Sequence, residues 1–177
     1  MIRPVLLTAA LVLGSRAAIA QNAPALLRAD WERDRKNVLA YVDAMPDSAM
    51  TFRPTPGVRT FAEQIQHILE SDLDVAATAL LGEQGPPAQT HGDSAQYLHH
   101  KAALRAHVAA AYDYILAAIG RATPAQWRRR SQLYRQPEQL PERWFALAHE
   151  HSIWTLGQVV PYLRLNGVTP PAYDMPF

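Results

Sequence analysis

The sequence predicts an all-α protein, a four-helix bundle with long connections between its helices. Four long segments place apolar residues at helical spacing, whereas no sustained alternating run and no Asn-Gly or Asp-Gly hairpin indicates a strand. No internal repeat suggests a solenoid. The 177 residues, of which 49% are hydrophobic, are enough for one compact domain with its own core.

The first twenty residues have the layout of a cleavable secretory signal peptide. A basic residue, Arg3, precedes an apolar run over Val5–Leu13, and small residues end the segment at Ala20. The apolar run is too short for a membrane span. We therefore expect cleavage after Ala20, export to the periplasm or the exterior, and a mature domain of residues 21–177. A plain N-terminal extension is the alternative.

The first predicted helix follows Pro24, because proline is favoured in the first turn of a helix. Its apolar residues are spaced by threes, fours and sevens, which gives one core-facing stripe. They are Leu27, Trp31, Val38, Tyr41, Val42 and Met45. Three prolines and a glycine then break the pattern before Thr60. With Glu63 three residues on, Thr60 has the spacing of a capping box, so we expect a second helix over residues 61–81.

The third and fourth helices have equally clear ends. Asp93 or Ser94 can cap a third helix that runs to Gly120, and a short helical turn is expected at residues 124–129. The fourth helix should span residues 141–166 and close at a glycine followed by two prolines.

A proline lies inside the fourth helix, at position 161. It removes a backbone N–H, and its ring approaches the carbonyl of Gly157. Because Gly157 has no side chain, we expect a local kink at Pro161 and not the end of the helix.

The composition excludes several kinds of site. No cysteine is present, so disulfides, thiolate catalysis and cysteine-bound zinc are ruled out. Loss of the signal would remove two arginines and no acid, leaving 15 basic against 16 acidic residues. Overall charge therefore gives no reason to expect nucleic acid as a partner, and the arginines at 128–130 are more typical of a solvated turn. The sequence also lacks a nucleophilic serine elbow, a phosphate loop and a dinucleotide fingerprint.

Two histidines of the fourth helix, His149 and His151, cannot bind one ion from a regular helix, because they point roughly 200° apart. His151 shares a face with Trp144, Thr155 and Tyr162 and is expected to point inward. His149 is then expected on the solvated face.

The other helical histidines are less distinctive. His67 borders the apolar face of the second helix, where a polar stripe is either a site or the wet side of the helix. Taken alone, His67 is better explained as structural or exposed. We expect His99, His100 and His107 of the third helix to face solvent.

Two motifs resemble those of the DinB-like proteins, a superfamily of metal-binding four-helix bundles with thiol-transferase and maleylpyruvate-isomerase relatives. The first is Phe52-Arg53-Pro54 leading into a helix with a central histidine, His67. The second is matched by His151, Gly157, Gln158, Tyr162, Leu163, Arg164 and Gly167, followed by two prolines. The resemblance covers roughly residues 25–171.

The resemblance implies a divalent metal such as zinc, nickel or iron, held by one histidine of the second helix and an i, i+4 pair of the last. His67 and His151 match two of these ligands, and Thr155 stands at the third. A threonine hydroxyl is a poor ligand beside imidazole, so the predicted site of His67, His151 and Thr155 lacks one strong donor. Candidates to replace it are Asp74, Glu70 and Glu150.

Two functions remain open. In the first, the chain is an exported DinB-like enzyme of hydrolase or thiol-transferase type that uses a metal held by His67 and His151. In the second, it is a non-catalytic bundle that binds a small ligand in the emptied cleft, or a structural module that forms a homodimer. In the second case no cofactor is expected, and His151 and Thr155 would hydrogen-bond each other across one helical turn. Neither function requires a membrane span.

Overall fold

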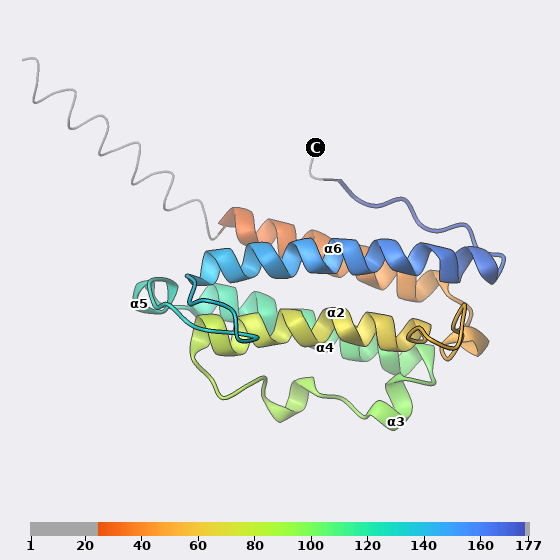
Figure 1. Ribbon diagram of the computed structural model, residues 1–177, viewed down its shortest axis with the longest axis horizontal. Coiled ribbons are helices and arrows are strands. Elements are labelled where there is room, and N and C mark those ends of the chain that lie inside the picture. Colours follow the sequence, from red (N-terminus) through yellow and green to blue (C-terminus); the bar gives the residue numbers. More distant parts are fainter. Residues whose placement is uncertain (1–24, 176–177) are drawn as a thin grey trace, which may run out of the picture.

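The computed structural model describes residues 25–175, which fold as a four-helix bundle (Figure 1). An N-terminal helix covers residues 25–44. It is followed by α2 (Phe61–Asp74), α4 (Lys101–Arg121) and α6 (Pro141–Leu165). The predicted all-α class is confirmed. The signal predicted in residues 1–20 lies outside the described residues and stays a prediction, and none of the helices in residues 25–175 is long and apolar enough to cross a membrane.

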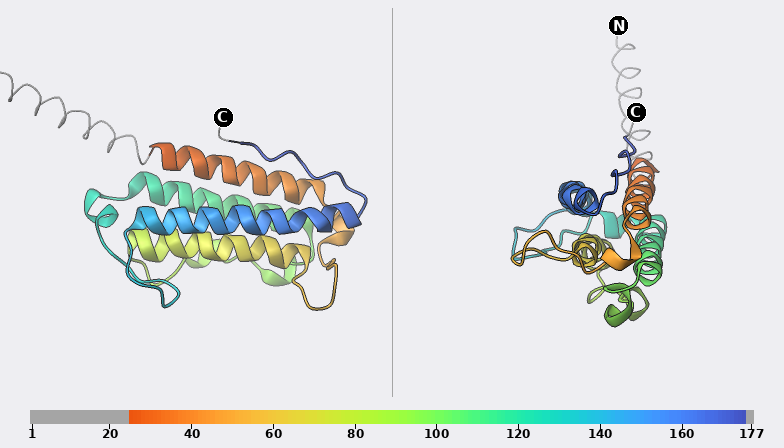
Figure 2. Two further views of the ribbon diagram at one scale, coloured as in Figure 1. Left: turned by 45° about the horizontal axis from the view of Figure 1, so that its top comes forward. Right: turned by 90° about the vertical axis from the view of Figure 1, so that its right-hand side faces the viewer.

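The four helices occupy the corners of a square when the bundle is seen from its end (Figure 2). The N-terminal helix and α6 run in one direction, and α2 and α4 run in the other. Two neighbours with the same direction require a long return connection, and residues 82–100 provide it between α2 and α4. The antiparallel neighbours α2 and α6 carry the predicted histidines.

The core follows the predicted apolar stripes. Trp31, Val38, Tyr41 and Val42 of the N-terminal helix are all buried, as is Met45 directly after it. Trp31 lies edge-on to Phe145 of α6, with ring centroids 5.3 Å apart. Aromatic pairs in this arrangement contribute beyond the burial of their area, so the pair ties the N-terminal helix to α6.

The second helix begins at the predicted capping box. The Glu63 N–H donates to the Thr60 hydroxyl at 3.2 Å, and the Thr60 N–H donates to the Glu63 carboxylate at 2.6 Å. Helical structure extends to residue 81 as predicted, but its last seven residues, η2 (Val75–Leu81), form a π-helix. The helix ends at Gly82, whose φ of 79° is readily adopted only by glycine.

Arg129 supports the end of the π-helix. Its guanidinium donates to the carbonyl oxygens of Thr78 and Ala79 at 3.0 and 3.2 Å, and to a third carbonyl, that of Leu80, at 3.4 Å. The last carbonyls of a helix lack intrahelical donors, so this side chain satisfies groups that would otherwise need water. The neighbouring Arg130 donates to the carbonyl of Glu138 at 2.8 Å. Two arginines of the 128–130 run therefore bind backbone.

The prediction of a single third helix is wrong, because this segment forms two helices. Asp93 caps α3 (Ser94–Tyr97), and its carboxylate accepts from the Ala95 N–H at 3.0 Å. The chain then becomes extended at His100, and α4 begins at Lys101. The cause is a distant cap: the Lys101 N–H donates to the carboxylate of Asp47 at 2.8 Å.

The remaining elements agree with the sequence. The predicted short turn is α5 (Pro124–Trp127), and α6 continues through Pro161 without ending there. After Gly167, which has a φ of 73°, the chain returns along the N-terminal helix. There the Asp174 N–H donates to the Asn37 side chain at 2.8 Å.

Replacing Arg129 by alanine should destabilise the fold by about 1–2 kcal/mol, because charged hydrogen bonds to three carbonyls are lost. Urea unfolding followed by circular dichroism measures the effect. Arg128→Ala is the matched control, since Arg128 is exposed and has no side-chain hydrogen bond to other residues in 25–175. Equal stability of the two variants would show that water replaces Arg129 at no cost.

Candidate functional site

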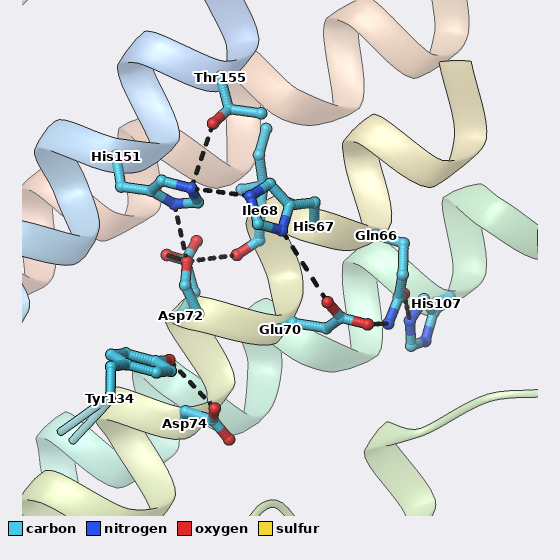
Figure 3. Close-up of polar contacts among 11 residues, drawn as sticks. Gln66, His67, Ile68, Glu70, Asp72, Asp74, His107, Tyr134, His151 and Thr155 are labelled. Atoms are coloured by element: carbon cyan, nitrogen blue, oxygen red, sulfur yellow. Dashed lines mark hydrogen bonds and ion pairs between the residues drawn. The ribbon is translucent and has the colours of Figure 1, made fainter. Parts of the chain in front are cut away.

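The antiparallel packing of α2 against α6 brings the side chains of His67 and His151 into contact (Figure 3). Their Nε2 atoms lie 3.1 Å apart, and the rings are nearly perpendicular at 86°. The Thr155 hydroxyl lies 3.4 Å from the same Nε2 atom of His151. The structure therefore brings together all three residues of the predicted site, and Thr155 is buried with 2% of its surface exposed.

Ser71 fixes the proton arrangement of His151. Its hydroxyl lies 3.0 Å from the Ile68 carbonyl oxygen and 3.0 Å from the Nδ1 atom of His151. A carbonyl can only accept, so we assign the serine proton to Ile68, as is common for a helical serine. The serine oxygen then accepts from the Nδ1–H of His151. This tautomer leaves the lone pair of His151 on Nε2, directed at His67 and Thr155.

Both facing imidazoles favour the neutral form. Burial lowers the pKa of His67 and of His151 below the ordinary 6.5. The positive charge of Arg59 lowers both pKa values further, and His67 also lowers that of His151. Two imidazoles this close cannot both be protonated without strong repulsion. At neutral pH the pair therefore offers lone pairs and N–H donors, not positive charge.

Only part of the donor set suits a metal centre. Two imidazole nitrogens bound to one ion at roughly 2.1 Å lie roughly 3.0–3.4 Å apart, so the separation within the His67–His151 pair suits two ligands of one ion. The third position is a neutral hydroxyl. Within residues 25–175 no group of three or more His, Asp or Glu side chains could hold a metal. The residues present do not fit a tight three-ligand centre.

None of the three acidic residues that could replace the missing ligand reaches the space between His67 and His151. The carboxylate of Glu70 is 4.0 Å from Nδ1 of His67, the nitrogen that faces away from His151, and it accepts from Gln66 at 3.2 Å. Asp74 accepts from the Tyr134 hydroxyl at 3.0 Å. Glu150 is exposed. None of them completes the coordination.

A pocket of about 900 Å³ opens beside the histidine pair. Its walls come from α2 and α6 and from the two long connections that precede α4 and α6. The polar groups include His67, His151 and Glu70, and the apolar lining includes Leu73 and Leu147. A mostly apolar pocket with a few convergent polar groups is the usual form of a small-molecule site.

His107 corrects the prediction that the histidines of the third helix face solvent. It is 5% exposed, and its ring stacks on Tyr97 with centroids 4.3 Å apart. Its Nε2–H donates to the Gln66 side chain at 2.7 Å, and the Gln66 amide donates in turn to Glu70. This chain of contacts, visible in Figure 3, connects a second pocket wall to the acidic side chain beside His67. His99 and His100 are exposed, as predicted.

His149 corrects a second prediction. Instead of facing solvent, it donates from Nδ1 to the carboxylate of Asp34 at 2.5 Å. Asp34 is 3% exposed and belongs to the N-terminal helix. This hydrogen bond raises the pKa of His149. The two neighbouring histidines therefore have different contacts, because His151 lines the pocket and His149 ties α6 to the N-terminal helix.

Asp72 is the central polar residue that the sequence reasoning missed. It is fully buried and accepts from the hydroxyls of Ser152 at 2.8 Å and Tyr112 at 3.3 Å. The Ser71 hydroxyl also lies 3.4 Å from Asp72, so one serine contacts both Asp72 and His151. Burial raises the pKa of Asp72 well above the ordinary 3.8.

A sequence signal for these buried polar residues did exist. Asp72 lies at i+3, i+4 and i+7 of the apolar residues on α2, and is therefore on the core stripe. Asp34 lies three and seven residues after Trp31 and Leu27, and His107 lies three and four residues after Leu104 and Ala103. A charged or polar residue in a core-facing stripe is informative, because such groups are seldom buried without partners.

Comparisons with known proteins agree with this fold. A model of the DinB superfamily matches residues 30–159, which is most of the chain. The chain belongs to the DinB superfamily. A DinB-like protein from Bacillus subtilis has a similar crystal structure, with a TM-score of 0.69 and 18% sequence identity. The match covers 85% of this chain and 99% of the Bacillus chain. No functionally curated protein matches this DinB-superfamily chain.

The pKa values of three histidines should depart from the ordinary 6.5 in opposite directions. His67 and His151 should titrate below 6.5 and His149 above it, because the first two are desolvated and the third is paired with Asp34. Side-chain NMR spectra recorded from pH 4.5 to 8.5 measure all three. A His151 value above that of His149 would contradict the assigned network.

The direction of each pKa shift determines how that histidine affects the stability of the fold as the pH changes. A histidine with a lowered pKa contributes stability that is present above 6.5 and is lost as the pH falls through its folded value. A histidine with a raised pKa does the opposite, so the contribution of His149 is present below 6.5 and is lost as the pH rises through its folded value.

Asp72→Asn should stabilise the protein increasingly as the pH rises. An acid with a raised pKa binds its proton more tightly in the folded state, so the free energy of unfolding falls as the pH rises above 3.8. Asparagine removes that dependence while keeping an acceptor for Ser152. Urea unfolding at pH 4.5 and pH 8 measures it, with Glu138→Gln, an exposed carboxylate without an ion pair in residues 25–175, as the control. A variant equally destabilised at both pH values would contradict this origin.

Proposed function

We propose that this DinB-superfamily domain binds a small organic molecule in the pocket beside His67 and His151, and that the third metal ligand of the family pattern has been lost at Thr155. The observation that carries the proposal is the pair of neutral imidazoles 3.1 Å apart, next to a hydroxyl where a strong donor would be needed. The pocket volume of about 900 Å³ suits a ligand of drug-like size.

The imidazole pair supplies hydrogen bonds to such a ligand. Ser71 holds the lone pair of His151 on Nε2, and His67 offers an N–H at the same point. A ligand hydroxyl or amide that replaces the contact between the two imidazoles can accept from His67 and donate to His151. Because burial keeps the pair neutral, it can also take up a proton from a bound acid, which is the chemistry of a general base.

A second candidate is the metal-dependent enzyme of hydrolase or thiol-transferase type. It is favoured by one observation, that the separation of the two Nε2 atoms suits two ligands of one ion. In that case the ligand or water would have to supply the remaining donors. The two candidates differ in one measurable property, the amount of metal that the natural chain retains.

Thr155→His should create a metal site that the natural chain lacks. The threonine hydroxyl already lies 3.4 Å from Nε2 of His151, so a histidine at i+4 would present its ring to the same point. We expect the variant to retain one zinc per chain after dialysis and to bind zinc about 100-fold or more tighter than the natural chain. Elemental analysis and competition with a chromophoric chelator measure both.

Two further variants control the result. Thr155→Gln adds comparable bulk without a strong metal donor and should bind zinc no better than the natural chain. Combining Thr155→His with His67→Ala should abolish the gain, because one of three ligands is removed. If instead the natural chain retains one metal per chain and loses it in His67→Ala, the loss of the site at Thr155 is refuted and the metal-dependent enzyme is favoured.

A further inference from the structure

The charges around the pocket are all of one sign. Among the described residues that line it, Glu70 and Asp74 are carboxylates, and none is a lysine or an arginine. The hydrogen-bond partners of both carboxylates are neutral: the Gln66 amide donates to Glu70 at 3.2 Å, and the Tyr134 hydroxyl donates to Asp74 at 3.0 Å. The negative charge of this wall is therefore not cancelled from within the pocket.

The two carboxylates are close enough to act on one ligand group. They stand at i and i+4 on α2, so they share a helix face and are separated by about 6 Å along the axis. Figure 3 shows both on the α2 segment that also carries His67. Like charges at this spacing repel, and a positive group bound between them would relieve that repulsion.

The rest of the wall is suited to an apolar body. Trp144, Tyr97 and Tyr134 line the pocket together with Leu73 and Leu147. The Trp144 indole N–H is already satisfied by the Ser131 carbonyl at 3.0 Å, so its contribution to the pocket is hydrophobic surface. Aromatic side chains also favour a nearby cation through the negative faces of their rings.

We infer that the pocket selects an organic amine: an ammonium group between Glu70 and Asp74, carried by an aromatic or aliphatic body that lies against Trp144 and Leu147. This inference rests on the proposed function and names its ligand class. The ammonium would lie within about one helical turn of His67, so the imidazole pair would meet the part of the ligand next to the amine.

A neighbouring hollow carries side chains of both charge signs and provides the contrast. It has a volume of about 560 Å³, shares His67 and Glu70 with the pocket, and is lined by Arg53 and Arg59. Arg53 is partly neutralised by Glu63 at 3.6 Å. An anionic ligand would find arginines only in this hollow and would be repelled by the carboxylates of the pocket.

Three probes with the same indole body test the inference: tryptamine, which is cationic, tryptophol, which is neutral, and indole-3-acetate, which is anionic. Isothermal titration calorimetry of the metal-free chain gives the affinities, and the His67 and His151 NMR signals report binding at the pocket. We expect tryptamine to bind about tenfold or more tighter than tryptophol, and indole-3-acetate to bind weakest. Added salt should weaken tryptamine binding alone.

Substitutions of the carboxylates locate the effect. Glu70→Gln and Asp74→Asn should each weaken tryptamine binding about three- to tenfold and leave tryptophol unchanged. Glu150→Gln is the matched control, because Glu150 adjoins His151 in sequence, is exposed and is not among the described residues that line the pocket. All three variants conserve shape, and their circular dichroism spectra should match that of the natural chain.

The outcomes separate this inference from the proposed function. Equal binding of the three probes, with shifts at His67 and His151, would overturn the preference for an amine and leave the ligand pocket intact. Tighter binding of indole-3-acetate would overturn it too and would indicate Arg53 and Arg59. Tryptamine binding that neither Glu70→Gln nor Asp74→Asn weakens would also overturn it. If no probe binds or shifts either histidine, the proposed function itself fails.

Discussion

The structure depends on the register between α2 and α6, which is fixed by a row of polar contacts along the antiparallel pair. From one end, the Gln64 amide meets the Tyr162 hydroxyl at 3.4 Å, His67 meets His151, and Asp72 meets Ser152. Buried polar groups are costly when unpaired, so a slip of one helix past the other would break every contact in the row at once. The same register that satisfies the interior places the imidazoles at the pocket wall. Fold specificity and site geometry therefore have one cause.

Asp72 links this register to the rest of the bundle. It receives hydrogen bonds from α4 through Tyr112 and from α6 through Ser152, so three helices meet at one carboxylate. Taking a carboxylate out of water is unfavourable, and hydroxyl donors offset only part of that cost. The buried carboxylate makes the packing of the helices more specific. An apolar residue at 72 would pack in several arrangements, whereas the carboxylate needs its hydrogen-bond donors in place. Because Ser71 contacts both Asp72 and His151, the arrangement around Asp72 also positions the His151 imidazole at the pocket wall.

Local chemistry explains what the sequence could predict. The Thr60 and Glu63 capping box, the stop at Gly167 and the continuation through Pro161 depend on residues within a few positions of one another, and all are observed. The break before α4 depends on Asp47, which lies 54 residues from Lys101 and carries no local signal. The pairing of His149 with Asp34 likewise joins two helices whose facing stripes could not be matched from periodicity alone. Family resemblance, not spacing, predicted that His67 meets His151.

Thr155 explains how the histidine pair can be satisfied without a metal ion. A threonine hydroxyl both donates and accepts, so at 3.4 Å it can direct its proton toward the lone pair on Nε2 of His151. The Nε2 atom of His67 lies 3.1 Å from the same atom, close enough to donate a proton to that lone pair. The imidazole is thus satisfied by protein groups alone. A metal ion would have to displace these hydrogen bonds and would gain only two strong donors in exchange. A histidine at 155 would instead add a third lone pair directed at the same point, and the three lone pairs would then require a cation.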